Sequence, residues 1–171
     1  MRWSWIDRIL ELEPGRRIVA IKNLSFAEEF FDDHFRKTAT TPGIPIMPAS
    51  LIIEGMAQTA GVLVGHAERF REKVILAKIG VAELDEDIEP GRTIRFTATI
   101  DRLDRQGAAT SGVVEVVEIG PAGAMQTRRI GRIDLIFSHI DQNMAGLGFP
   151  EHNFVFGESF QTLLRISDVA W

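Results

Sequence analysis

The sequence predicts an α+β domain in which antiparallel strands surround one central helix, and three observations support this. A long segment from Pro48 to about Phe70 is apolar on nearly every side of a helix. Four long strand-like segments follow it, separated by turn residues. Another strand-like segment precedes it. The predicted order is therefore strands, one buried helix, then four strands.

The N-terminal part is predicted to form a hairpin. Residues 5–12 mix apolar and charged side chains and lead to Pro14 and Gly15, a turn signal. Residues 17–24 are rich in β-branched residues and alternate in polarity, which is typical of a strand. Residues 26–31 are aromatic and acidic, and long enough for one helical turn.

The long apolar segment is predicted to be a buried helix. Pro48 suits the first helical position, where its missing N–H needs no partner. Apolar side chains surround the axis instead of forming one stripe, so the helix should be buried on nearly every side. Gly55, Gly61 and Gly65 remove side chains where another backbone could come close. Polar residues return from His66, where we expect the helix to reach solvent.

The segments after the helix divide into strands and an extension. The strands are predicted at residues 74–81, 93–103, 109–119 and 128–137. The tail is rich in aromatic residues, which indicates that it packs on the body or on a partner. We therefore divide the chain into a domain of residues 1–140 and a C-terminal extension of residues 141–171.

Composition excludes several classes of protein. Cysteine is absent, which excludes disulfides and thiolate metal sites. The net charge of −5 argues against broad nucleic-acid binding. The longest apolar stretch, residues 51–65, contains Glu54 and Gln58 and is shorter than the ~20 residues that a membrane span requires. No secretory signal is visible, so we expect a soluble cytoplasmic protein that binds neither membrane nor nucleic acid.

Two titratable residues lie in surroundings that favour chemistry. Glu54 lies near the start of the apolar helix, and burial favours the protonated form of a carboxyl group, so Glu54 is a candidate proton donor. It could equally cap the helix or face solvent. His34 lies between aromatic residues, and an imidazole can act as a base near neutral pH. The alternative is that His34 lies at the surface, or in the core with its ring nitrogens hydrogen-bonded.

Other polar groups of the helix could assist. Gln58 follows Glu54 by one turn, so it could bind the carboxylate, a substrate or a backbone group. The N–H groups of Ala49 and Ser50 have no partner within the helix and lie at the positive end of its dipole. They could bind an oxygen that becomes negative during a reaction. The chain has no H-x-x-x-H pair, P-loop or G-x-G-x-x-G motif, and we predict no metal site.

Four segments together resemble a known family. They are IDRILELEPGRRIVAIKN, FFDDHF, PGIPIMPASLIIEGMAQTAG and LAKIGVAELDEDIEPGRTIRFTATI. In this order they resemble the FabZ-type 3-hydroxyacyl-[acyl-carrier-protein] dehydratases, over roughly residues 5–140. The resemblance implies a hotdog fold, in which a curved antiparallel sheet wraps a long central helix.

The resemblance also implies the reaction and its residues. His34 of one protomer would face Glu54 of the other, at the interface of a homodimer that can assemble into a trimer of dimers. His34 would take the α-proton of an acyl-carrier-protein thioester, Glu54 would protonate the departing hydroxyl, and the Ala49 N–H would hold the thioester oxygen. The acyl chain would lie in an apolar tunnel beside the helix. The predicted substrate-binding residues are Phe35, Met47, Pro48, Ala49 and Gln58. The reaction is redox-neutral and needs no cofactor.

The chain departs from the family pattern at three places. Residues 36–41 separate Phe35 from Pro42, where the family has His-Phe-Pro-Gly. Ala49 stands where the family has a glycine. The usual N-terminal lead-in helix and its following loop are missing, and a C-terminal tail is added. Two alternatives therefore stay open. One is a hotdog thioesterase that activates water in the same tunnel. The other is an acyl-binding subunit that has lost turnover.

Overall fold

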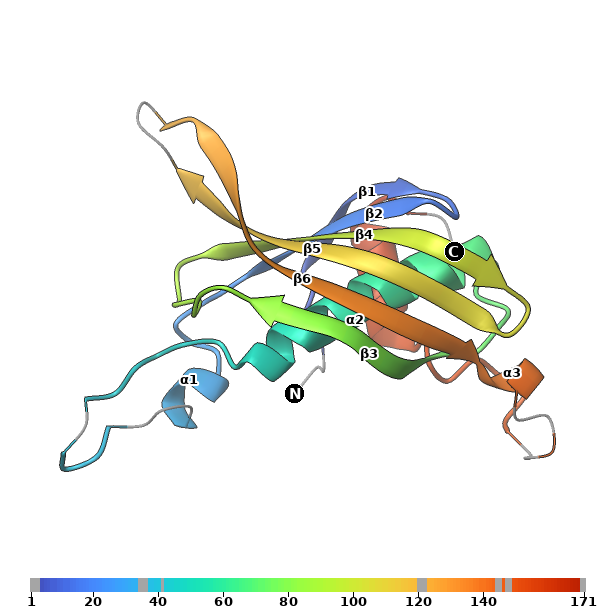
Figure 1. Ribbon diagram of the computed structural model, residues 1–171, viewed down its shortest axis with the longest axis horizontal. Helices are drawn as coiled ribbons and strands as arrows, with labels where there is room; N and C mark the ends of the chain where they lie inside the picture. The colour runs from blue at the N-terminus through green and yellow to red at the C-terminus, as the bar shows by residue number, and fades with distance from the viewer. Residues whose placement is uncertain are drawn as a thin grey trace.

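The computed structural model describes residues 4–33, 37–40, 42–119, 123–143, 146 and 149–169. Within them a six-stranded antiparallel sheet curves around one long helix (Figure 1). The strands are β1 (Arg8–Glu13), β2 (Arg17–Asn23), β3 (Val74–Leu84), β4 (Thr93–Asp104), β5 (Gly107–Ile119) and β6 (Met125–His139). The helices are α1 (Phe30–Asp33), α2 (Ala49–Ala67), α3 (Ile140–Asn143) and α4 (Glu158–Ile166). The α+β prediction is confirmed.

The strand order is β1-β2-β4-β5-β6-β3, with β1 and β3 at the edges. The predicted N-terminal hairpin is present, and Gly15 adopts a φ of 68° in its turn, a conformation that favours glycine. The four later strands are present but longer than predicted. For example, β3 continues to Leu84 because that residue still pairs with Gly131 of β6. Pairing between strands therefore extends them beyond the hydrophobic pattern.

Helix α2 begins one residue later than predicted. Pro48 has a ψ of 133°, so it precedes the first helical residue, and its carbonyl oxygen accepts the N–H groups of Leu51 and Ile52. The helix also ends earlier, at Ala67. The chain then turns back with φ values of 52° at two successive residues, and the Phe70 N–H donates to the Gly65 carbonyl. The burial of the Phe70 ring offsets this backbone strain.

The glycines of α2 admit aromatic rings. A Cβ on Gly55 would lie 2.6 Å from the Phe96 ring and 3.0 Å from the Trp5 carbonyl oxygen. A Cβ on Gly65 would lie 2.4 Å from the Phe156 ring. The prediction of close backbone contact is therefore confirmed at Gly55 only. At Gly65 the space is taken by rings, because the C-terminal segment packs there.

The C-terminal segment lies against the body of the protein. The Asn153 Nδ2 donates to the carbonyl oxygens of Phe70 and Glu72, at 2.9 and 3.0 Å. Further along, the Ile9 N–H donates to the Ser167 Oγ at 3.0 Å. The buried side chains of the segment are Phe156, Leu163 and Leu164. These contacts join the segment to the end of α2 and to β1, while the division of the chain at residue 140 stays a prediction.

Candidate active site

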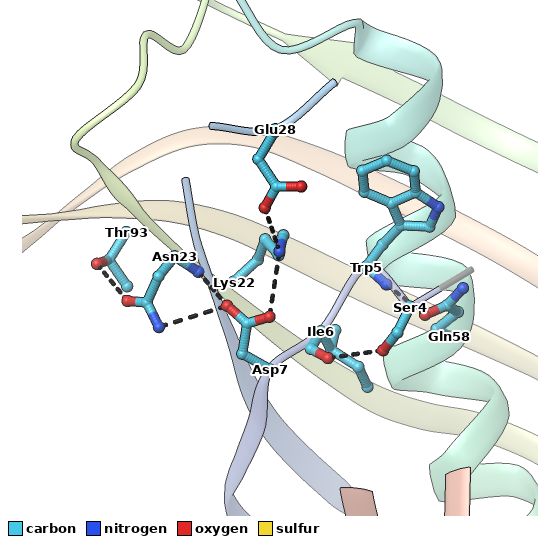
Figure 2. A network of polar contacts seen from close by, with 9 residues as sticks. All are labelled: Ser4, Trp5, Ile6, Asp7, Lys22, Asn23, Glu28, Gln58 and Thr93. Atoms are coloured by element: carbon cyan, nitrogen blue, oxygen red, sulfur yellow. Dashed lines mark hydrogen bonds and ion pairs between the residues drawn. The ribbon is translucent and has the colours of Figure 1, made fainter. Parts of the chain in front are cut away.

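Glu54 is held by a hydrogen-bonded chain of three residues. It is partly buried on α2, and its Oε1 accepts a hydrogen bond from the Gln58 Nε2 at 2.9 Å. The Gln58 Oε1 in turn accepts the Trp5 backbone N–H at 2.8 Å (Figure 2). Both ends of the buried Gln58 amide are therefore occupied, which fixes its orientation. Of the partners that the sequence left open for Gln58, the structure shows both the Glu54 carboxylate and a backbone group, and Glu54 does not cap the helix.

An apolar pocket opens beside this carboxylate. Its volume is about 280 Å³, and Glu54 and Gln58 supply its polar lining. The remaining lining residues are Ala57, Gly61, Val74, Ile75, Leu76, Phe137, Val155, Phe156 and Phe160. They come from α2, the β3 edge strand, β6 and the C-terminal segment. A carboxylate at the side of an apolar pocket can exchange a proton with a bound apolar molecule that carries one polar end.

The residues at the start of α2 lie apart from this pocket in the described structure. Met47 is 1% exposed and its N–H donates to the Ile88 carbonyl at 2.8 Å, so it belongs to the core. Pro48 is partly buried, and Ala49 is exposed at the first helical position. Ala49 is the first residue of α2, so its N–H has no carbonyl group within the helix to which it could donate. The predicted substrate contacts of all three residues stay predictions.

His34 and Phe35 lie outside the described residues. The last described residue before them is Asp33, which ends α1. The ring of Phe30, at the start of α1, lies 5.6 Å from the ring of Trp5. Trp5 therefore contacts two parts of the site. Its ring packs near Phe30 in the segment before His34, and its backbone N–H binds the Gln58 side-chain amide, which in turn binds Glu54.

A partly buried ion-pair network fixes the same N-terminal region. Lys22 is 6% exposed, and its Nζ donates to Asp7 at 3.1 Å and to Glu28 at 2.8 Å (Figure 2). The second Asp7 oxygen accepts the Asn23 N–H at 2.6 Å. Burial lowers the pKa of Lys22, but the hydrogen bonds to Glu28 and Asp7 and the attraction of both carboxylates outweigh it and raise the pKa above 10.5. Glu28 thereby ties the approach to α1 onto β2.

We expect Lys22→Met to lower the free energy of unfolding by about 1–3 kcal/mol at neutral pH, because the partly buried carboxylates lose a charged donor. The raised pKa means that folding favours the protonated amine. The stabilisation is thus fully present below about pH 10.5 and is lost as the pH rises through the folded-state pKa. Urea titrations of wild type and variant across this range measure it. The exposed Lys37→Met is the control, and an equal loss from it would contradict the prediction.

We expect Gln58→Met to lower kcat by up to about a hundredfold while KM changes by less than about twofold. The reason is that the variant removes the donor that orients Glu54. Steady-state kinetics on a 3-hydroxyacyl thioester measure the two constants, with thermal melting to follow the loss of the Trp5 N–H partner. Gln161→Met, an exposed change on α4, is the control. A rise in KM at unchanged kcat would instead assign Gln58 to substrate binding.

Neither a metal cluster nor a membrane span is found in the described part of the chain. Its histidines, aspartates and glutamates form no group of three that could hold a metal ion. None of its helices combines the length and the apolar character needed to cross a bilayer.

The architecture and the site define the class of protein. A curved antiparallel sheet around one central helix is the hotdog fold, and here that helix carries a carboxylate beside an apolar pocket. The sequence model of the FabA-like domain matches residues 2–119, and the chain belongs to this family.

Two curated relatives of this chain carry the same name. The 3-hydroxyacyl-[acyl-carrier-protein] dehydratase FabZ of Caldanaerobacter subterraneus is 38% identical over 114 residues, which cover 66% of this chain and 77% of the relative. The enzyme of the same name from Solibacter usitatus is 41% identical over 113 residues, 65% of each chain. The predicted family resemblance is confirmed.

Solved structures show the same fold at low identity. The dehydratase heterocomplex ApeI:P from Xenorhabdus doucetiae matches with a TM-score of 0.59 and 12% identity, covering 83% of this chain and 90% of that one. An acyl-CoA hydrolase from Staphylococcus aureus matches with a TM-score of 0.55 and 11% identity, covering 80% and 71%. Dehydratases and hydrolases thus share this architecture, and these likenesses show the hotdog fold alone.

The sequence predictions did not include several residues of the site. Trp5 contributes its backbone N–H, and no side-chain pattern can signal such a role. Phe156 and Phe160 line the pocket from the C-terminal segment. The aromatic content of that segment indicated packing, but not against which surface.

Proposed function

We propose that this chain dehydrates 3-hydroxyacyl-[acyl-carrier-protein] to trans-2-enoyl-[acyl-carrier-protein] in fatty-acid biosynthesis. One observation carries the proposal: the Glu54 carboxylate of a FabA-like chain is oriented by Gln58 at the side of an apolar pocket. Such a pocket suits an acyl chain, and the oriented carboxyl group suits proton transfer at its polar end. We also propose a cytoplasmic location, where an acyl-carrier protein would be met.

In the proposed reaction one proton leaves carbon 2 and one hydroxyl leaves carbon 3. The His34 imidazole accepts the proton as the carbon–carbon double bond forms. Glu54, in its protonated form, gives its proton to the departing hydroxyl, which leaves as water. The Ala49 N–H at the positive end of α2 stabilises the negative charge that develops on the thioester oxygen. Two positioned acid–base groups contribute ~10²–10⁴-fold each.

We propose that the site is completed in a homodimer joined at β3. This strand is an edge of the sheet, and an edge presents unpaired backbone groups that can pair with another strand. It also exposes Ile75, Leu76 and Ile79 at 36%, 38% and 44%. Ile75 and Leu76 line the Glu54 pocket as well, so a second copy seated on β3 would lie next to Glu54. A two-fold interface of this kind would bring His34 of the partner to that pocket.

The direct test is turnover by the purified chain. We expect loss of enoyl-thioester absorbance when the chain hydrates a crotonyl thioester, and formation of the enoyl product from 3-hydroxyacyl-carrier substrates. Release of free thiol from acyl thioesters, followed in parallel, measures the thioesterase alternative. Release of thiol without hydration would replace the dehydratase proposal with the thioesterase alternative. Absence of both activities would support the acyl-binding alternative.

A further inference from the structure

The C-terminal segment supplies one side of the Glu54 pocket. Val155, Phe156 and Phe160, named here the C-terminal wall, line it together with α2. On α2 the lining begins at Glu54 and continues to Gly61, two turns further along the same helix face. An acyl chain that starts at Glu54 and follows this face therefore runs toward the C-terminal wall.

The wall closes the helix face at Gly65. The Phe156 ring is 2% exposed and occupies the space that a side chain at Gly65 would need. It packs edge-on against Phe70, with ring centroids 5.0 Å apart, and against Phe160 at 5.7 Å. Three rings thus form a cluster across the end of the helix face.

The wall is anchored on both sides in the sequence. Before it, the Asn153 Oδ1 accepts the N–H groups of Val155 and Phe156, while its Nδ2 donates to two carbonyl oxygens of the turn after α2. After it, the Ser167 Oγ accepts the Ile9 N–H of β1. A wall held in this way by buried rings and hydrogen bonds resists displacement by a longer ligand.

Helix geometry gives the length of the pocket. With a rise of 1.5 Å per residue, Gly61 lies about 10 Å and Gly65 about 16 Å beyond Glu54 along the axis. An extended hydrocarbon advances about 1.3 Å per carbon, given single bonds of about 1.5 Å. The space between Glu54 and the wall, about 10–16 Å long, therefore accommodates about eight to twelve carbons.

We propose that the C-terminal wall ends the acyl pocket and restricts this enzyme to short and medium acyl chains. The proposal deepens the proposed function and rests on it, because it concerns the substrate of the same pocket. The 3-hydroxybutyryl and 3-hydroxyoctanoyl groups fit in front of the wall, whereas a 3-hydroxyhexadecanoyl group would collide with it.

The test compares Phe160→Ala with a matched control, Phe154→Ala. Phe160 is partly buried and lines the pocket, whereas Phe154 is 45% exposed on the same segment and does not line it. We expect wild type to show a kcat/KM at least about tenfold higher for the octanoyl than for the hexadecanoyl substrate. Phe160→Ala should raise the hexadecanoyl value about tenfold relative to the butyryl value. Phe154→Ala should change neither.

A second variant shortens the pocket instead of lengthening it. A Cβ on Gly61 would meet only the Phe137 ring, at 3.6 Å, so a side chain there fits the fold and projects into the pocket. Gly61→Val should reduce octanoyl turnover about tenfold relative to butyryl turnover. It keeps the proposal testable even if Phe160→Ala fails to fold, which thermal melting reveals.

Binding separates this proposal from the proposed function. Calorimetric titration with octanoyl- and hexadecanoyl-pantetheine needs no turnover. If no substrate is dehydrated, the proposed function fails. The wall is still supported if wild type binds only the octanoyl compound and the Phe160→Ala variant binds both compounds. Equal binding or turnover of both lengths by wild type overturns it. So does the same change from Phe154→Ala as from Phe160→Ala.

Discussion

Glu54→Gln is expected to lower kcat for dehydration by about 10²–10⁴-fold, with little change in stability. Glutamine keeps the shape of the side chain and a carbonyl oxygen that can still accept the Gln58 N–H, which Glu54 accepts at 2.9 Å. It has no proton to give to the departing hydroxyl. The loss should therefore fall on kcat, because the acyl pocket itself is unchanged. Steady-state kinetics with a 3-hydroxyoctanoyl carrier substrate measure this.

The matched control is Glu68→Gln. Glu68 is the residue that follows the last turn of the same helix, away from the pocket lining. This variant should retain activity within about twofold, since the change does not reach the reacting groups. Thermal melting of both variants shows whether folding is preserved. Wild-type kcat in a well-folded Glu54→Gln protein would exclude Glu54 as the acid and would leave the pocket without a proton donor among its described lining residues.

Mixing two inactive chains is expected to restore activity, and this is the second large effect. In a heterodimer of His34→Ala and Glu54→Gln, one site would combine the intact imidazole of one chain with the intact carboxylate of the other. The second site would lack both groups. Such a heterodimer, isolated with two different affinity tags, should show about half of the wild-type kcat per dimer. Each homodimer alone should be nearly inactive.

The reciprocal heterodimer makes the result decisive. It pairs a wild-type chain with a chain that carries both substitutions. If each site is shared between chains, both of its sites lack one group and it is nearly inactive. If each site lies within one chain, it keeps about half of the activity and the first heterodimer shows almost none. That opposite pattern would overturn the proposal that the site is shared between two chains, and a monomer in light scattering would overturn the dimer itself.

The fold could be predicted from the sequence because its signals are local and repeated. The apolar surround of α2 indicated a helix buried on nearly every side, and alternating segments between turn residues indicated the strands. The boundaries were less accurate. Strand β3 extends to Leu84 through pairing with β6, and Pro48 precedes α2 because its ψ is extended. Both depend on partners distant in the sequence or on a single backbone angle.

The sequence by itself determined the central helix, the strands around it and the family. It also placed Gln58 and Glu54 on one helix face, because their spacing of four residues does so, but it left open whether Gln58 binds the carboxylate, a substrate or a backbone group. Only the tertiary structure decided what surrounds that pair. The Trp5 N–H reaches Gln58 from 53 residues away, and Phe156 covers Gly65 from the far end of the chain. Such contacts follow from how separate segments pack, since a backbone donor carries no side-chain signal and an aromatic residue does not specify the surface that it covers.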